Sequence, residues 1–340
     1  SSVALTNATI SGNRAGVDQN GSVIHDTVGG GFWAISAPAR VTLDHVTITN
    51  NSVNRNGADA GAGFRVDTAG NVVRMSNSIV YGNFRQADTA TPIADDVDNR
   101  TTTNVDFQLT GNNIIGVRTG NAIGGVAHFT ANPGLLALAD NGGVLLPGGD
   151  AARTHALNLG ASGAVDAAIG STLIEDQRGI TRPQGLSTDL GAFEAPGVIY
   201  VNNNWTGTAA NSVVDGNLET VGSQGAIFGI DAFASVADVF AKYGSFAGTI
   251  VLNGGAYSTV DLASVGHVTL QLVRDLTDNE LDVTIGTLTG GPGDAIVTRS
   301  LNSAEADLII EGGDFGGVIS GDGNLDKNSA GTLVLSGVNT

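Results

Sequence analysis

The sequence predicts an all-β fold, a solenoid of short stacked strands, and three observations support this prediction. The segments VALTNATISGN (3–13), VTLDHVTITNN (41–51) and VRMSNSIVYGN (73–83) repeat one another in register. The last two copies lie 32 residues apart, and the same offset carries Phe32 onto Phe64, as expected for a repeated structural unit. The chain also has 50 glycines among 340 residues but only seven prolines, which is typical of many short strands joined by tight turns.

Each copy is predicted to form two short strands around a corner. In the second copy, apolar and polar residues alternate over 41–43 and again over 46–49, and the pair Asp44-His45 interrupts them. Every copy ends on an asparagine, and these are Asn13, Asn51 and Asn83. Stacked at the ~4.8 Å spacing of paired strands, the three side chains would form an amide ladder at a bend. We therefore expect them to have a structural role, with a ligand site as the alternative.

The charge of the chain limits its partners. The sequence has 33 acidic and 15 basic residues, a net charge of −18, which repels phosphate backbones and anionic lipid. We expect no nucleic acid partner, and no membrane insertion because no apolar run approaches the ~18 residues of a span. The absence of cysteine excludes disulfides, thiolate metal sites and a cysteine nucleophile. Because the chain begins and ends inside repeats, we expect it to be part of a longer protein.

From 132 to 196 the repeat gives way to a different pattern. The pieces ADNGG (139–143), RTHA (153–156), DQRG (176–179), Arg182-Pro183 and 189–194 resemble the end of the choice-of-anchor Q domains of bacterial surface proteins. The resemblance implies that 1–131 forms the rungs of a right-handed parallel β-helix of the pectate-lyase type and that 132–196 closes it. It also implies a large protein that is secreted or displayed at the cell surface. VLLPGG (144–149), inserted before RTHA, departs from the family pattern.

A β-helix exposes its apolar bore at each end, and we expect the closing segment to cover one end. Ion pairs among Asp176, Arg178, Arg182 and Asp189 would hold this segment in place, although a catalytic Arg and Asp cluster is the alternative. The full set of residues that we assign to the closing segment is Arg153, His155, Asp176, Arg178, Arg182 and Asp189.

A second β-helical module is predicted over 197–340. The apolar spacing of DAFASVADVFAKYG indicates a helix near 232–243, with Asp231 as its N-cap and Gly244 at its end. This helix resembles the one that caps pectate-lyase-like β-helices. Short strands are expected over 268–273, 281–288, 295–298 and 307–313.

The last 25 residues, GGVISGDGNLDKNSAGTLVLSGVNT (316–340), resemble the autotransporter-associated β-strand repeat. That resemblance implies an extracellular location, at the outer surface of a Gram-negative bacterium. Within the repeat, Asp322 to Asp326 matches the start of a calcium loop, but Leu333 stands where the loop needs Glu, so we expect a turn there.

A search for catalytic chemistry finds little. Hydrolases of the pectin-lyase fold share an Asp-Asp pair, and this chain has Asp95-Asp96, but it has neither their Gly-His-Gly nor their Arg-x-Lys. We expect this pair to be solvated in the polar loop IADDVDNR. The five histidines, which show no metal-ligand spacing, are His25, His45, His128, His155 and His267. The sequence thus indicates no enzyme, no metal site and no cofactor.

These observations favour an extracellular structural or adhesive protein without catalysis. Its partner would be a surface glycan, a protein or other copies of the chain, bound through the polar excursions at 14–28, 52–60 and 84–104. One alternative is a polysaccharide lyase or glycoside hydrolase of the same fold. Another is a glycan-binding module that uses exposed aromatic residues, for which the candidates are Phe32, Trp33, Phe64, Tyr81 and Phe84. Of these, Phe32 and Phe64 are better explained as stacked core residues.

Overall fold

The computed structural model forms two compact units. Unit 1 comprises Ser1–Leu157 and Ser162–Ala195, and unit 2 comprises Asn158–Ala161 and Pro196–Thr340. The structure describes residues 1–16, 27–35, 38–55, 60–67, 70–85, 91–101, 106–160, 162–218, 225–244, 248–262, 267–274, 282–298 and 307–340.

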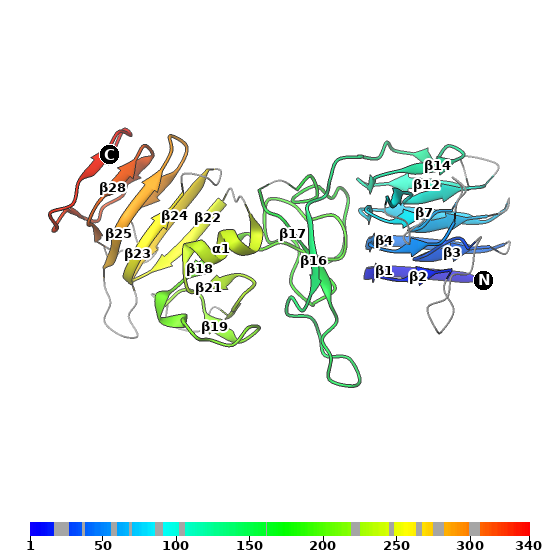
Figure 1. The fold of residues 1–340 in the computed structure, drawn as a ribbon, viewed down its shortest axis with the longest axis horizontal. Helices are drawn as coiled ribbons and strands as arrows, with labels where there is room; N and C mark the ends of the chain where they lie inside the picture. The colour runs from blue at the N-terminus through cyan, green and yellow to red at the C-terminus, as the bar shows by residue number, and fades with distance from the viewer. Residues whose placement is uncertain are drawn as a thin grey trace. The chain divides into compact units, whose positions relative to one another are not determined.

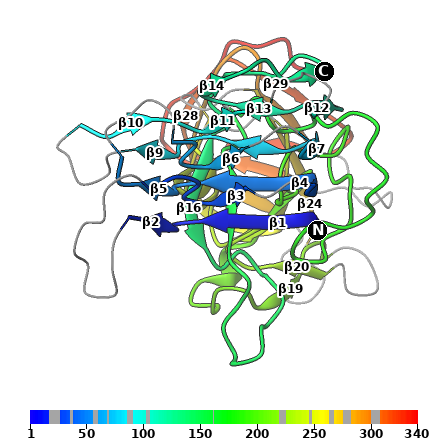
Figure 2. The same ribbon diagram turned by 90° about the vertical axis from the view of Figure 1, so that its right-hand side faces the viewer.

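Unit 1 contains three main sheets, in which most neighbouring strands run parallel (Figures 1 and 2). Sheet A consists of β1 (Ser2–Ser11), β4 (Arg40–Thr49), β7 (Val72–Ser76), β8 (Ile79–Val80), β12 (Phe107–Thr110), β13 (Ile114–Ile115) and β15 (Gly124–Gly125). Sheet B consists of β2 (Arg14–Ala15), β5 (Ser52–Val53), β9 (Phe84–Arg85) and β10 (Ile93–Ala94). Sheet C consists of β3 (Phe32–Ala34), β6 (Phe64–Val66), β11 (Val97–Asn99) and β14 (Arg118–Gly120).

The chain visits these sheets in turn, and we call one passage through them a circuit. The first circuit spans 2–34, the second 40–66, the third 72–99 and the fourth 107–120. Val3 pairs with Val41 and Val41 with Val73, so the three repeated segments lie beside one another in the register that their sequences predict. A 32-residue offset would carry Val73 onto Val105, which lies outside the described residues, and Met75 onto Phe107, but Phe107 pairs with Val73 and Leu109 with Met75. The fourth circuit therefore runs two residues out of the predicted 32-residue register.

Every circuit turns at a left-handed residue in sheet A. Asn7, His45, Asn77 and Gly111 have φ angles of 48°, 52°, 46° and 60°, and strand register places them beside one another. Asn and Gly tolerate this conformation, whereas most residues with a Cβ do not. This corner is the interruption that the pair Asp44-His45 predicts, and the chain turns there in every circuit.

The core of unit 1 is made by the inward residues of successive circuits. Leu43 and Met75 are fully buried, and Leu5 in β1 packs against the same cluster while remaining partly exposed. The rings of Phe32 and Phe64 lie 5.3 Å apart and those of Phe64 and Phe107 5.8 Å apart, so the aromatic residues form a column within the core. Burial of each such side chain contributes roughly 1.5–3 kcal/mol.

The excursions predicted at 14–28, 52–60 and 84–104 are each wrong in part, because each begins with a strand of sheet B, namely β2, β5 and β9. Residues 84–85 and 97–99 form β9 and β11, which belong to sheets B and C rather than to a projecting loop. After the fourth circuit, the chain forms an antiparallel hairpin of β16 (Leu135–Ala139) and β17 (Thr154–Leu157), followed by a segment with few strands up to Ala195.

Unit 2 contains two larger sheets of mostly short parallel strands. Sheet D consists of β18 (Val198–Val201), β21 (Ala232–Phe233), β22 (Gly248–Asn253), β24 (Val268–Val273), β26 (Ala295–Val297) and β29 (Val318–Ser320). Sheet E consists of β23 (Gly255–Asp261), β25 (Val283–Gly290), β27 (Leu308–Ile310), β28 (Gly313–Phe315), β30 (Leu325–Asp326) and β31 (Leu333–Leu335). A 3₁₀ turn, η1 (Asn203–Trp205), precedes an antiparallel pair of β19 (Val213–Asp215) and β20 (Gly225–Ile227).

The predicted helix is present but starts later than expected. α1 (Val236–Tyr243) has Ser235 as its N-cap, where the side chain accepts a hydrogen bond from the Asp238 amide, and it ends at Gly244. Asp231 is not the cap, because its carboxylate accepts from the Ile227 amide in the preceding turn. The described residues are thus mostly strands with one α-helix, in agreement with the all-β prediction. Within them, no helix has both the length and the apolar character needed to cross a membrane.

Candidate functional site

The three asparagines that end the repeated segments are hydrogen-bonded to one another. The Asn13 Nδ2 atom donates to Asn51 Oδ1 at 2.9 Å, and Asn51 Nδ2 donates to Asn83 Oδ1 at 2.9 Å. The backbone amides of Asn13 and Asn51 donate to the same two oxygens at 3.0 Å. Asn51 and Asn83 are fully buried, whereas Asn13 is exposed. These hydrogen bonds therefore join the first circuit to the second and the second to the third.

The ladder ends on Asp96, a residue that the sequence analysis placed in a solvated loop and not in the ladder. Asn83 donates from its backbone amide and from Nδ2 to Asp96 Oδ1, both at 2.8 Å, and the Val117 amide donates to Asp96 Oδ2 at 2.8 Å. The fourth circuit passes directly from β13 to β14, without a strand of sheet B and without a ladder asparagine. The Asp96 carboxylate takes the place that this asparagine would occupy.

Glycines make room for the ladder. A Cβ atom added to Gly31 would lie 3.0 Å from Asn51 Nδ2, and one added to Gly63 would lie 2.7 Å from Asn83 Nδ2. Strand register places Gly63 beside Asp96, one residue before the pair Phe64 and Val97. The 32-residue offset from Gly63 reaches Asp95, whereas the observed register places Asp96 there, so the offset locates the ladder position only to within one residue.

The expectation that Asp95 and Asp96 are solvated is wrong, because both are buried. Burial raises the pKa of Asp95 to about 6, against hydrogen bonds from the Ala60 and Gly61 amides that favour its charged form. Burial also raises the pKa of Asp96. Arg85 lies 3.7 Å from Asp95 Oδ2, and Asp95 Oδ1 has no hydrogen-bond partner.

His45 occupies the left-handed corner, as its alignment with Asn7 and Asn77 predicts. Its Nδ1 atom lies 2.9 Å from Asp44 Oδ1, and its Nε2 atom is buried without a partner. The hydrogen bond with His45 lowers the pKa of Asp44, which also accepts from the Ser76 hydroxyl at 2.7 Å. This pair is a local anchor for the corner.

The closing segment covers a side of sheet A instead of its end, so the expected end cover is wrong. Thr9 of the first circuit donates to Gln177 Oε1 at 2.7 Å, and Thr47 of the second accepts from the Ala192 amide at 3.0 Å. The third circuit is reached as well, since the Gly191 amide donates to the Asn77 carbonyl at 2.8 Å. The segment thus crosses successive circuits along the direction in which they stack.

This lateral cover explains why outward residues of sheet A are apolar and buried. Ile79 and Ile114 pair in register with each other, and Ile79 pairs with Thr47 on the outer face. All three are buried, and an added Cβ at Gly191 would lie 3.0 Å from Ile79 Cδ1. Here two successive apolar residues, Ile79 and Val80, mark a strand that is covered on both faces.

Arg178 is held inside the closing segment by three groups and one ring. Its guanidinium pairs with Asp176 at 2.7 Å and donates to the carbonyls of Asn141 and Glu194. Its Cζ atom lies 3.8 Å from the centre of the Phe193 ring, a cation–π arrangement. The predicted ion pair of Asp176 with an arginine is therefore present.

The predicted ion pair of Asp189 is wrong, because Glu194 is the partner of Arg182. Arg182 Nη1 donates to Glu194 Oε2 at 2.7 Å and to the Asp189 carbonyl at 3.0 Å. The Asp189 carboxylate instead accepts from the amides of Asp166 and Ala195, each at 2.6 Å. Burial and the neighbouring Glu194 raise the pKa of Asp189. The sequence analysis missed Glu194 because it ends the family-like segment 189–194 without a charged neighbour.

His155 and Arg153, the other two residues assigned to the closing segment, have different surroundings from each other. His155 is buried, with Nδ1 2.7 Å from the Leu136 carbonyl and Nε2 2.8 Å from the Ser11 hydroxyl, and burial lowers its pKa. Arg153 is exposed and contributes its carbonyl, which accepts from Gln177 Nε2 at 3.2 Å. His155 thus joins the closing segment to the first circuit, whereas the Arg153 side chain takes no part in the buried cluster.

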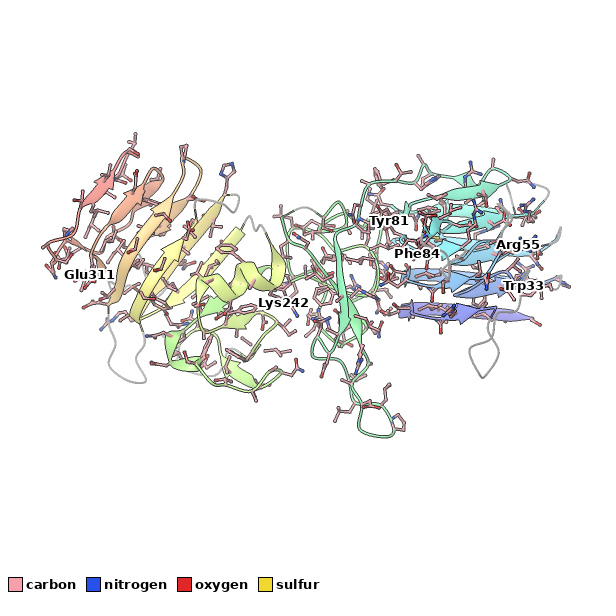
Figure 3. The ribbon with its side chains drawn as sticks, in the orientation of Figure 1. Trp33, Arg55, Tyr81, Phe84, Lys242 and Glu311 are labelled. Carbon is pink, nitrogen blue, oxygen red and sulfur yellow. The ribbon has the colours of Figure 1, made fainter. Side chains whose placement is uncertain are left out.

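The aromatic candidates do not form one groove. Phe64 is buried and Phe32 stacks on it, so both belong to the core as expected. Tyr81 lies against Gly116, where an added Cβ would be 2.8 Å from the ring. In Figure 3, Trp33 lies at the far side of unit 1 from Tyr81 and Phe84. Trp33 is therefore the aromatic candidate that remains for a glycan-binding surface, and it lies apart from Tyr81 and Phe84.

The other candidate sites bring few groups together. His25 lies outside the described residues, and within those residues no group of three or more His, Cys, Asp or Glu side chains is arranged to hold a metal ion. Asp326 lies in β30 and is exposed, in a segment that pairs with β27. Comparisons of the chain with protein-family models, curated proteins and solved structures found no match.

Proposed function

We propose that the chain is an extracellular, non-catalytic scaffold with adhesive faces, built from right-handed parallel β-helices. The four circuits of unit 1 are its rungs, and unit 2, with α1 as its capping helix, is a second β-helix. The resemblance of 132–196 to choice-of-anchor Q domains and of 316–340 to autotransporter-associated repeats supports a place on, or secretion from, a Gram-negative cell.

The observation that carries the proposal is the use of buried polar side chains. The ladder from Asn13 to Asp96 commits its amide and carboxylate groups to neighbouring circuits, which stiffens the stack and leaves none of these groups free for a substrate. The closing segment uses its arginines in the same way, on carbonyls and carboxylates of its own chain.

The enzyme alternative has one observation in its favour, the raised pKa of Asp95. A glycoside hydrolase needs two carboxyl groups that reach the scissile bond from opposite sides. Asp95 is 0% exposed, and both oxygens of Asp96 accept backbone or ladder hydrogen bonds. The geometry therefore favours the scaffold.

The test compares binding with cleavage. The full chain is incubated with a panel of bacterial, plant and animal polysaccharides while reducing ends and unsaturated products are measured, and its retention on the insoluble forms is measured in parallel. We expect retention on at least one polysaccharide without product. Product that disappears when Asp95→Asn and Asp96→Asn are combined would establish the enzyme instead. The location is tested separately by treating intact cells with protease, which should cleave the chain if it lies at the cell surface.

A further inference from the structure

Trp33 stands on the outer face of sheet C. Phe32 and Ala34 on either side of it point into the core, so the strand alternation places the Trp33 side chain outward. It is 42% exposed, in contrast to Trp205, the other tryptophan, which is 9% exposed. Figure 3 shows Trp33 at the outer side of the stacked circuits.

The orientation of the indole is fixed before any ligand arrives. Its Nε1 atom donates to Asp67 Oδ2 at 2.8 Å. Gly29 lies against its base, since an added Cβ would be 2.5 Å from the Trp33 Cβ atom and 3.1 Å from Cγ. A side chain held in this way loses little conformational entropy on binding.

Paired charges continue from Trp33 across the neighbouring circuits. Strand register places Trp33 beside Arg65 and Arg65 beside Asp98. Arg65 donates to Asp98 at 2.7 Å and pairs with Asp67 at 2.8 Å. The Asp98 carboxylate also accepts from Arg100 Nε at 2.9 Å and from the Thr119 hydroxyl at 3.1 Å. We call this surface the Trp33 strip, and it consists of Trp33, Arg65, Asp67, Arg100 and Thr119 together with the fully buried Asp98 that pairs with them.

The Trp33 strip is electrically balanced in a chain of net charge −18. It carries two arginines and two aspartates, each paired within the strip. The carboxylate of Asp67 is held in its charged form: hydrogen bonds from Arg65 and Trp33 lower its pKa in spite of the opposing effect of burial. Since every charge has a partner, a neutral ligand can cover the strip without leaving an ion unpaired.

We propose that the Trp33 strip binds an uncharged saccharide chain. The apolar face of one sugar ring stacks on the indole, and its hydroxyl groups exchange hydrogen bonds with the partly exposed side chains of Asp67, Arg65 and Arg100. The acidic field of the whole chain disfavours uronic-acid polymers at the same place. This inference rests on the proposed adhesive function and identifies the face and the ligand class for it.

The test uses the two tryptophans as reporters. In a Trp205→Phe variant, tryptophan fluorescence comes from Trp33 alone, and linear oligosaccharides of cellulose, mannan, xylan and galactan are titrated, with oligogalacturonate as the acidic counterpart. We expect at least one neutral oligosaccharide to shift the Trp33 emission and to protect it from acrylamide quenching, and oligogalacturonate to bind more weakly. Calorimetric titration of the unmodified chain with the same oligosaccharide checks the affinity.

Variants separate the Trp33 strip from other surfaces. Trp33→Ala should lower the affinity by at least about tenfold, as truncation of a central tryptophan does in binding sites, and Trp33→Phe should lower it less. Tyr81→Ala, at an aromatic residue away from the strip, should leave the affinity unchanged. Unaltered binding in Trp33→Ala, or no binding of any neutral oligosaccharide to the unmodified chain, would overturn the assignment. In either case, continued retention on insoluble polysaccharide without product would leave the scaffold proposal standing, whereas product release would overturn the scaffold itself.

Discussion

Replacing Asn83 with alanine tests whether the ladder holds the circuits together. The Asn83 side chain is fully buried and makes four hydrogen bonds. Its Oδ1 atom accepts from the amide and from Nδ2 of Asn51, and its Nδ2 atom donates to the Ile48 carbonyl and to Asp96 Oδ1. Asn83→Ala removes all four bonds while leaving the backbone amide of residue 83 in place.

The size of the loss in unfolding free energy depends on which groups keep another hydrogen-bond partner in Asn83→Ala. Asn51 Nδ2 still donates to the carbonyls of Ile10 and Thr49, and the Ile48 carbonyl still accepts from Tyr81. The Asn51 amide is left buried without a partner, at a cost of about 1–3 kcal/mol, and the lost bond to the Asp96 carboxylate adds about 1.5–3 kcal/mol. We therefore expect unit 1 to lose about 2.5–6 kcal/mol of its free energy of unfolding.

The assay is equilibrium unfolding in urea, followed by Trp33 fluorescence in the Trp205→Phe background so that the signal comes from unit 1. Asn13→Ala is the matched control, because the exposed Asn13 side chain donates one hydrogen bond to the ladder and its loss should cost about 1 kcal/mol or less. The denaturant slope should be unchanged in both variants. A loss in Asn83→Ala that is no larger than that in Asn13→Ala would refute the ladder as a source of stability.

Three further predictions concern other buried groups of unit 1. The pKa of Asp95 in the folded chain, about 6, lies above its ordinary value of 3.8. The free energy of unfolding should therefore fall by up to about 3 kcal/mol as the pH rises from about 4 to about 6. The urea midpoints of Asp95→Asn should lack this decline. At the left-handed corner, His45→Asn should change the thermal midpoint little, whereas the β-branched His45→Val should cost about 2 kcal/mol, and equal midpoints would contradict the backbone argument. Arg182→Met leaves the Glu194 carboxylate buried without its ion-pair partner and should cost about 3–5 kcal/mol of stability. This loss should appear as faster proteolysis within 162–195. Arg153→Met, at an exposed site, should be cleaved as slowly as the unmodified chain.

The sequence predicted the structural features that recur from one circuit to the next. It missed features that occur once. The strand class, the core column of Phe32 and Phe64, and the stacking of Asn13, Asn51 and Asn83 follow from period-two alternation and a fixed offset. These features depend on the residue beside them in the next circuit, which the same offset locates. Helix α1 was placed within a few residues because Gly244 ends it, but its start was missed because Ser235 competes with Asp231 as a cap.

The lateral position of the closing segment was beyond the reach of the sequence. A segment that covers an end and one that covers a side both need buried apolar residues and paired charges. The difference lies in the receiving surface, where Thr47 and Ile79 face outward and are buried. Thr47 follows the alternation of an exposed strand, so its burial depends on contacts with residues more than 100 positions away, such as the Ala192 amide.

The choice of aspartate at residue 96 follows from the direction of the ladder. Asn13 donates to Asn51, Asn51 to Asn83 and Asn83 to Asp96, so each ladder asparagine donates one hydrogen bond onward along the ladder. The fourth circuit sends a donor the opposite way, the Val117 amide, and the group between must accept on both sides. A carboxylate has two acceptor oxygens and an amide has only one, so aspartate meets this need and asparagine does not. The close approach of the fourth circuit requires a residue without a Cβ at Gly116, where an added Cβ would lie 2.5 Å from Asp96 Oδ2. Asp96 therefore ends the ladder at the circuit where the chain stops visiting sheet B.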